Sequence, residues 1–277
     1  MKKESIVKKI FLLYVPLTVL MIFLLFPFYW TFVTSIKPES EIYLRAVHYW
    51  PENPTVEVYG RLFTRMNFIK PMMNSFTVAL VTTVITLMVS VMAAYAFSRF
   101  RFKGRKVLMV MFLTNNMFPT VLLLIPLYAI MRKLGILYTP MALILAYTTF
   151  TIPFSVWLLN GYLNDLSLSL EEAAMIDGAS RVKAFWRIIF PILVPGLVAT
   201  GVYIFMTSWN EYTFAVMFTN EASRTIPVAL KSLIGQLAVQ WDVLTAGGIV
   251  TIIPVCIMFF FAQKRLVEGL TAGAVKG

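Results

Sequence analysis

Charged residues are scarce in this 277-residue chain: Asp, Glu, Lys and Arg make up 13% of the sequence, and hydrophobic residues make up 59%. A soluble domain carries about a quarter charged residues and about half apolar ones. The apolar excess is too large for one globular core, so we predict a membrane protein. The net charge of +11 would suggest nucleic acid binding on a soluble protein. Here the positions of the charges indicate membrane topology instead, and no nucleic acid partner is expected.

Cysteine and histidine are nearly absent, with a single example of each, Cys256 and His48. One cysteine excludes an intrachain disulfide, and no His/Cys cluster is available to hold a metal, so neither a metal nor a cofactor is expected. The sequence also lacks the phosphate-binding pattern G-x-x-x-x-G-K-[ST] and the catalytic patterns H-E-x-x-H and G-x-S-x-G. We therefore predict no catalytic site, and the chain is not expected to be an enzyme.

Six long apolar stretches contain no Lys, Arg, Asp or Glu. A hydrocarbon core about 30 Å thick needs about 20 helical residues, and a charge buried in it is costly. The first stretch is longer than a signal-peptide core and has no small-residue cleavage site after it, so it is a retained span. The predicted fold is all-α and polytopic, one membrane domain over residues 1–277, with spans at 10–34, 75–97, 107–131, 139–159, 188–209 and 243–262.

The distribution of Lys and Arg predicts the orientation of the spans. An even number of spans puts both termini on one side, and that side holds 15 of the 24 basic residues, against nine on the other. The short loop 99–106 alone has five basic residues and no acid. Because cytoplasmic loops are enriched in Lys and Arg, we predict a multi-pass protein of the inner (plasma) membrane, in contact with lipid, with both termini cytoplasmic.

Proline lies inside most of the predicted spans, for example Pro119 and Pro126 in the third. Membrane helices tolerate proline where neighbouring groups satisfy the freed backbone. These prolines suit hinges in a moving protein and ordinary kinks in a static bundle equally well.

The longest cytoplasmic loop, residues 160–187, carries signals for two short helices. Ser169 and Glu172 are spaced as a capping box, with Ser169 as the N-cap residue and Glu172 at the third helical position. Gly178 is placed to end this helix in a left-handed conformation, and Ser180 to cap a second helical piece that runs into the fifth span.

Within this loop the sequence becomes recognisable. Glu172-Ala173-Ala174, three residues, Gly178, nine residues and then Ile188-Ile189-Phe190-Pro191 resemble the EAA loop of bacterial ABC-importer permeases, with Phe190 in place of a leucine. Residues 93–99 resemble the end of the second span in carbohydrate-importer permeases. The tail 263–277 resembles the C-terminus of the smaller of the two maltose-type permease subunits, and residues 209–212 fit the same group. The chain is thus identified as similar to the carbohydrate (maltose-type) permease family over nearly its whole length.

The resemblance implies that loop 160–187, here named the EAA loop, forms a coupling helix that docks on an ATPase subunit. Its alanines would allow close approach, and its acids would pair with basic groups at the rim of a cleft. A helix lying on lipid is the alternative, but such helices favour Lys and Arg, whereas this one begins with acids. The predicted ATPase-coupling residues are Glu171, Glu172, Ala173, Ala174, Asp177, Gly178, Ala179 and Ser180.

The resemblance also implies partners: a second homologous permease subunit, two ATPase subunits that hydrolyse ATP, and an extracytoplasmic solute-binding protein facing residues 210–242. The tail is expected to reach the interface between the ATPase subunits. The expected function is ATP-driven import of a sugar or oligosaccharide by alternating access, with a polyol or a glycerol phosphate ester as alternative solutes. A secondary carrier is disfavoured because the spans contain no ionisable residues.

No single residue is assigned to the substrate. The aromatic residues Trp209, Tyr212 and Trp241 suit the face of a sugar, but they equally suit an aromatic belt at the membrane interface, which we favour.

Overall fold

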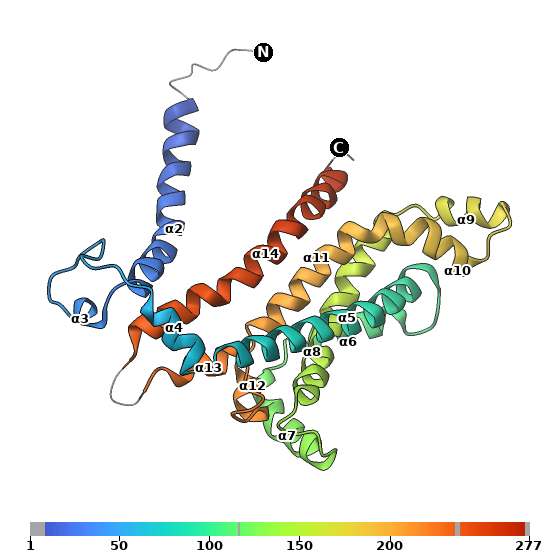
Figure 1. Ribbon diagram of the computed structural model, residues 1–277. Helices are drawn as coiled ribbons and strands as arrows, with labels where there is room; N and C mark the ends of the chain where they lie inside the picture. Colours follow the sequence, from blue (N-terminus) through green and yellow to red (C-terminus); the bar gives the residue numbers. More distant parts are fainter. Residues whose placement is uncertain (1–8, 116, 236–238, 275–277) are drawn as a thin grey trace. The chain divides into compact units, whose positions relative to one another are not determined.

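The computed structural model describes residues 9–115, 117–235 and 239–274, and within them the regular elements are helices (Figure 1). One isolated β-bridge joins Ile234 and Val239. The predicted all-α fold is therefore confirmed for the described part of the chain. The last residues of the tail, 275–277, lie outside it, as do residues 1–8 at the other end.

Five helical segments are long and apolar enough to cross a membrane, and each overlaps a predicted span. The first combines a π-helical turn, η1 (Ile10–Tyr14), with α2 (Val15–Ser35). The second and fourth are α5 (Ile69–Arg99) and α8 (Pro140–Asp165). The fifth joins α10 (Arg181–Ala184), the π-helical η3 (Phe185–Ile189) and α11 (Phe190–Trp209), and the last is α14 (Trp241–Ala274).

The third predicted span is interrupted. It consists of α6 (Arg105–Asn115), the 3₁₀ turn η2 (Thr120–Leu123) and α7 (Leu124–Lys133), with a bend of 94° between the two halves. Pro119 stands directly before η2 with an extended backbone. Proline lacks the N–H that would continue a helix, so its position accounts for the new start. Counted as one, the bent pair raises the number of candidate spans to six.

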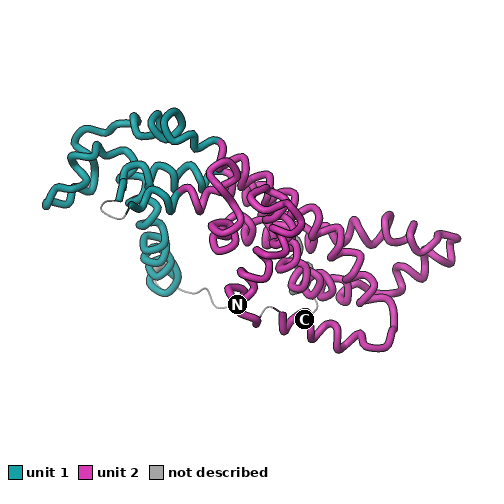
Figure 2. The backbone as a smooth tube through the Cα atoms, turned by 90° about the horizontal axis from the view of Figure 1, so that it is seen from below, with its two compact units in different colours: residues 1–69, 230–253 teal, residues 70–229, 254–277 magenta. Residues whose placement is uncertain are grey.

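Short helices complete the described chain. They are α3 (Glu39–Ile42), α4 (Glu57–Thr64), α9 (Ser169–Ile176), α12 (Thr213–Phe218) and α13 (Ile226–Ser232). The chain divides into two compact units, one of residues 1–69 and 230–253 and the other of residues 70–229 and 254–277 (Figure 2). In the first unit, an ion pair joins Arg61 on α4 to the buried Asp242 at the start of α14.

The second unit contains the EAA loop and two apolar clusters. One cluster packs α8 against α7 and α12 around Leu143 and Phe218. The other joins the end of α5, the end of α8 and η3 around Phe97, Leu163 and Ile189. The second cluster lies at the base of the EAA loop, so it gives that loop a fixed support. Beyond it, α9 and α10 form a corner past the ends of α8 and α11 (Figure 1).

Candidate functional site: the EAA loop

The start of α9 differs from the predicted capping box, which is wrong. Ser169 is already the first helical residue, Leu168 takes the N-cap position, and no side chain caps the helix. The backbone N–H of Ser169 donates instead to Ser167 Oγ at 3.2 Å, and the two serine hydroxyls lie 2.7 Å apart. Ser167 thus binds both groups of Ser169 that the capping box would have used, the hydroxyl and the backbone N–H.

The end of α9 matches the prediction. Gly178 has φ = +85°, in the left-handed region. Its N–H donates to the carbonyl of Met175 at 3.1 Å, and the N–H of Ala179 donates to the carbonyl of Ala174 at 3.0 Å. These two bonds form a Schellman motif, which satisfies carbonyls that the helix end leaves free. The chain therefore turns sharply at Gly178, with Asp177 as the C-cap residue.

The second helical piece also begins as predicted. Ser180 Oγ accepts the N–H of Lys183 at 3.3 Å, which caps α10. The helix continues through η3 into α11, and the side chains of Ala184 and Phe185 are buried. The loop is therefore a defined corner of two capped helices, and its second helix is continuous with a predicted span.

Burial separates the eight predicted coupling residues into two groups. Glu171 and Ala174, three positions apart on α9, are buried, and Ala179 is half-buried. The other five are exposed, together with the apolar side chains of Ile176 and Val182, which are 85% and 68% exposed. We name these exposed residues the docking corner: Glu172, Ala173, Ile176, Asp177, Gly178, Ser180 and Val182.

Sequence reasoning missed Ile176 and Val182. Both are large apolar side chains on either side of the helix-ending glycine, inside a loop that is otherwise polar at that point. That placement is the signal that could have found them. Exposed apolar groups next to acids and small residues form a surface suited to binding another protein.

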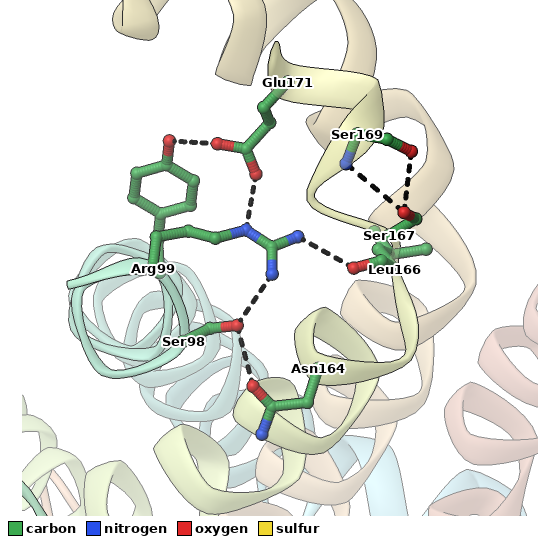
Figure 3. A network of polar contacts seen from close by, with 8 residues as sticks. Ser98, Arg99, Asn164, Leu166, Ser167, Ser169 and Glu171 are labelled. Carbon is green, nitrogen blue, oxygen red and sulfur yellow. Dashed lines mark hydrogen bonds and ion pairs between the residues drawn. The ribbon is translucent and has the colours of Figure 1, made fainter. Parts of the chain in front are cut away.

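Glu171 lies differently from the expectation that it pairs with a partner's basic groups. Its carboxylate accepts a hydrogen bond from Tyr95 Oη at 2.8 Å (Figure 3). It also forms an ion pair with Arg99, whose Nε donates to it at 2.5 Å. The side chains of Arg99 and Glu171 are each 5% exposed. A buried carboxylate requires such partners, and the last turn of α5 provides them.

Arg99 connects α5 to more than α9. A second guanidinium nitrogen donates to the carbonyl of Leu166 at 3.2 Å, in the linker between α8 and α9, and a third donates to Ser98 Oγ at 3.1 Å. Ser98 Oγ in turn donates to Asn164 Oδ1 at 2.8 Å, near the end of α8 (Figure 3). One side chain thus ties together the ends of α5, α8 and α9.

Aromatic rings surround this polar network. The Tyr95 ring meets the Phe185 ring edge-on, with centroids 4.9 Å apart, and the Arg181 guanidinium lies over the Phe100 ring at 5.0 Å. These contacts join the end of α5 and the residue after it to α10 and η3. Both short helices of the EAA loop are therefore fixed to α5.

At the other end of α11, Trp209 is buried and stacks on Phe205. The interpretation of Trp209 as a lipid-facing belt residue is therefore wrong, while Tyr212 and Trp241 are exposed. The neighbouring carboxylate of Glu211 accepts the hydroxyl of Tyr147 at 2.7 Å and two backbone N–H groups of α12. Glu211 thus fixes α12 to α8.

Comparison with known proteins gives consistent matches. Residues 86–271 match the family described as binding-protein-dependent transport system inner membrane component. The chain is 37% identical to the sulfoquinovosyl glycerol transport system permease protein SmoH of Agrobacterium fabrum, over 95% of this chain and 93% of that protein. It is also 37% identical to the trehalose/maltose transport system permease protein MalG of Thermococcus litoralis, over 99% of each.

A solved structure has the same fold over nearly the whole chain. It is a chain from a bacterial ABC transporter involved in the import of the acidic polysaccharide alginate, with a TM-score of 0.82 and 26% identity. The match covers 96% of this chain and 100% of that one. The family match includes both the docking corner and Arg99.

Proposed function

This chain belongs to the family of binding-protein-dependent transport system inner membrane components, and on that premise we propose that it is the permease subunit of an ABC importer for a sugar or oligosaccharide. The observation that carries the proposal is the docking corner, an exposed turn of acids, small residues and apolar side chains supported by a buried ion pair. A turn exposed on one side and fixed on the other can transmit the movement of a bound protein to the spans.

The substrate class is proposed from the relatives. Their names refer to sulfoquinovosyl glycerol and to trehalose or maltose, and the solved transporter imports alginate. All of these contain sugar units, which supports a carbohydrate over the alternatives of a polyol or a glycerol phosphate ester.

The docking corner is proposed to bind an ATPase subunit. Glu172 and Asp177 are exposed, and neither has an ion-pair partner in the part of the chain that the structure describes. They are free to meet basic groups on a partner, while Ile176 and Val182 would bury apolar surface there. ATP hydrolysis would occur on two such subunits, and their closure would switch the pathway between inward- and outward-facing states.

Further partners follow from the same proposal. None of the most apolar window of the first helical segment, Phe11–Ser35, is buried by the described chain. Lipid and a second, homologous permease subunit are proposed to cover it. A solute-binding protein would approach from the extracytoplasmic side, with both termini of the single permease domain in the cytoplasm.

The experiment is co-purification. The tagged chain is expressed with its neighbouring permease and ATPase genes, as wild type and as Glu172→Lys. We expect the ATPase to co-purify with wild type and to be lost from the variant, because the added charge repels the basic groups that the corner would meet. Gly178→Val is expected to stay in the membrane and lose uptake as well, because a β-branched residue does not adopt the left-handed conformation of Gly178.

The control is Glu57→Lys, the same charge change on an exposed residue of α4, far along the chain from the EAA loop. It is expected to leave co-purification unchanged. Normal ATPase binding and uptake by Glu172→Lys would overturn the coupling role. Uptake of solute by this chain alone, without ATP, would overturn the ABC assignment.

A further inference from the structure

We propose that Arg99 is a positioning residue that locks the EAA loop to the end of α5, so that the docking corner and α5 move as one body during transport. The inference rests on the proposed function, because it concerns how movement at the docking corner reaches the membrane. It assigns a role to Tyr95, Arg99 and Glu171, three residues that lie outside the motif Glu172-Ala173-Ala174.

The first argument is the cost of the ion pair. Arg99 and Glu171 are both 5% exposed, and the removal of two charges from water is expensive. Replacing a buried ion pair by apolar residues of similar size is often neutral or stabilising. The apolar cluster around Phe97, Leu163 and Ile189 joins α5, α8 and η3 and contains no residue of α9. The specific attachment of α9 to the end of α5 is therefore made by the ion pair and by the hydrogen bond from Tyr95.

The second argument is direction. A guanidinium presents its N–H groups in a rigid plane, and that of Arg99 uses three nitrogens toward three targets: Glu171, the Leu166 carbonyl and Ser98. Apolar surfaces can slide past each other, but the two bonds that leave α5, to Glu171 and to the Leu166 carbonyl, have fixed directions and resist both sliding and separation. The bond to Ser98, within α5, holds the plane of the guanidinium in place. The contact can therefore transmit a pull as well as a push.

The third argument is rotation of α9. Tyr95 and Arg99 lie one helical turn apart on α5, and they bind the two different oxygens of the Glu171 carboxylate. Two attachments to one side chain fix the face of α9 that is turned inward. Successive helical residues are about 100° apart, so fixing Glu171 inward turns Glu172 and Ala173 outward, as observed.

The test compares the wild type with the double variant Arg99→Met, Glu171→Leu. A single change would leave one charge buried and unpaired and could prevent folding, whereas the double change keeps the apolar packing. The complex of both permeases, ATPase and binding protein is reconstituted in liposomes, and the ATP hydrolysed per solute imported is measured. We expect the double variant to assemble and hydrolyse ATP but to use several-fold more ATP per solute.

The control is Arg61→Met, Asp242→Leu, which removes the ion pair between α4 and α14, where Asp242 is buried and Arg61 is 39% exposed. It is expected to keep the wild-type ratio of ATP to solute. Arg99→Lys is expected to fall between wild type and the double variant, because a lysine keeps the charge but not the planar fork. A wild-type ratio in the Arg99→Met, Glu171→Leu complex would overturn the proposal.

A second readout needs neither solute nor ATPase. With Cys256 replaced by serine, spin labels are attached at Leu170→Cys on α9 and Met92→Cys on α5, both exposed positions. The distance distribution between the labels is expected to be narrow in the permease and broad in the double variant. Equal widths would overturn the lock even if the ATPase never bound, whereas loss of ATPase binding with a narrow distribution would count against the proposed function alone.

Adding the ATPase extends this readout to the working complex. If α9 and α5 move as one body, the wild-type distance is the same in the nucleotide-free and ATP-trapped states. A shift of that distance on ATP binding would show that α9 slides along α5, and it would overturn the proposal.

Discussion

At the scale of single residues, Gly178 shows how backbone conformation decides the shape of the docking corner. Its φ of +85° is unfavourable for residues with a side chain, and a Cβ placed there would meet no atom of the described chain within 4 Å. A substitution therefore acts through backbone strain and not through a clash with this subunit.

We expect Gly178→Val to reduce ATP-dependent uptake strongly and Gly178→Asn to retain most of it. A left-handed residue costs about 1–2 kcal/mol for most side chains, while Asn adopts this conformation more readily. Both variants add a side chain of similar size, so steric hindrance of the partner would affect them alike. Equal loss of uptake in the two variants would contradict the conformational explanation and point to the surface that Gly178 offers.

Residue-level prediction from the sequence succeeded where the cause is local. The turn at Gly178 and the cap at Ser180 each depend on a few neighbouring residues, and both are confirmed. The capping box failed because Ser167, two residues away, competes for the same backbone group. The partner of Glu171 was out of reach, since Arg99 lies 72 residues earlier and only the fold brings the two together.

At the scale of the elements, close packing of α8 and α11 depends on Gly196. A Cβ at this position would lie 2.7 Å from the ring of Tyr162 on α8. Small residues allow membrane helices to approach closely, and a ring held between two helices has little room to move.

We expect Gly196→Ala to lower the free energy of unfolding by about 1–3 kcal/mol, because the added methyl overpacks the contact. The change is measured as a lower thermal unfolding midpoint of the purified permease. Gly161→Ala is the matched control, since Gly161 lies on α8 next to Tyr162 but a Cβ there meets nothing within 4 Å. It should leave the midpoint unchanged or raise it. Similar midpoints for both variants would show that α8 and α11 can separate slightly at no cost.

The composition of the sequence predicts where the apolar helices lie, but it does not predict the break between α6 and α7. Five of the predicted spans overlap single helical segments, although Pro27, Pro153, Pro195 and Pro254 lie inside them. The third contains two prolines, and only Pro119 coincides with the break, while Pro126 lies within α7. The sequence marks where a helix can break, but packing against neighbours decides which proline does so.

At the scale of the whole molecule, the distribution of basic residues predicts which loops face the cytoplasm. Loop 99–106 and the EAA loop should lie on the same side as the ATPase, and the segment before α4 on the opposite side. This orientation is required if the docking corner is to meet an ATP-hydrolysing partner.

Single cysteines in a Cys256→Ser background test the orientation. We expect Glu52→Cys to react with a membrane-impermeant maleimide added outside spheroplasts, and Lys103→Cys to react only after the membrane is opened. Both side chains are exposed, so a difference in labelling reports the side of the membrane and not burial. The reverse pattern would place the docking corner outside and exclude the proposed coupling to ATP.

The π-helical turn η3 has a consequence for how the docking corner is aimed. Phe185–Ile189 lies between α10 and α11, where a π turn accommodates one more residue than an α turn. Since one residue corresponds to about 100° of rotation, this insertion sets the phase between the corner and the fifth span. The direction in which the docking corner faces is therefore fixed relative to the axis of α11. Removing one residue from η3 would preserve the surface of the corner and the length of α11, and would still present that surface in the wrong direction.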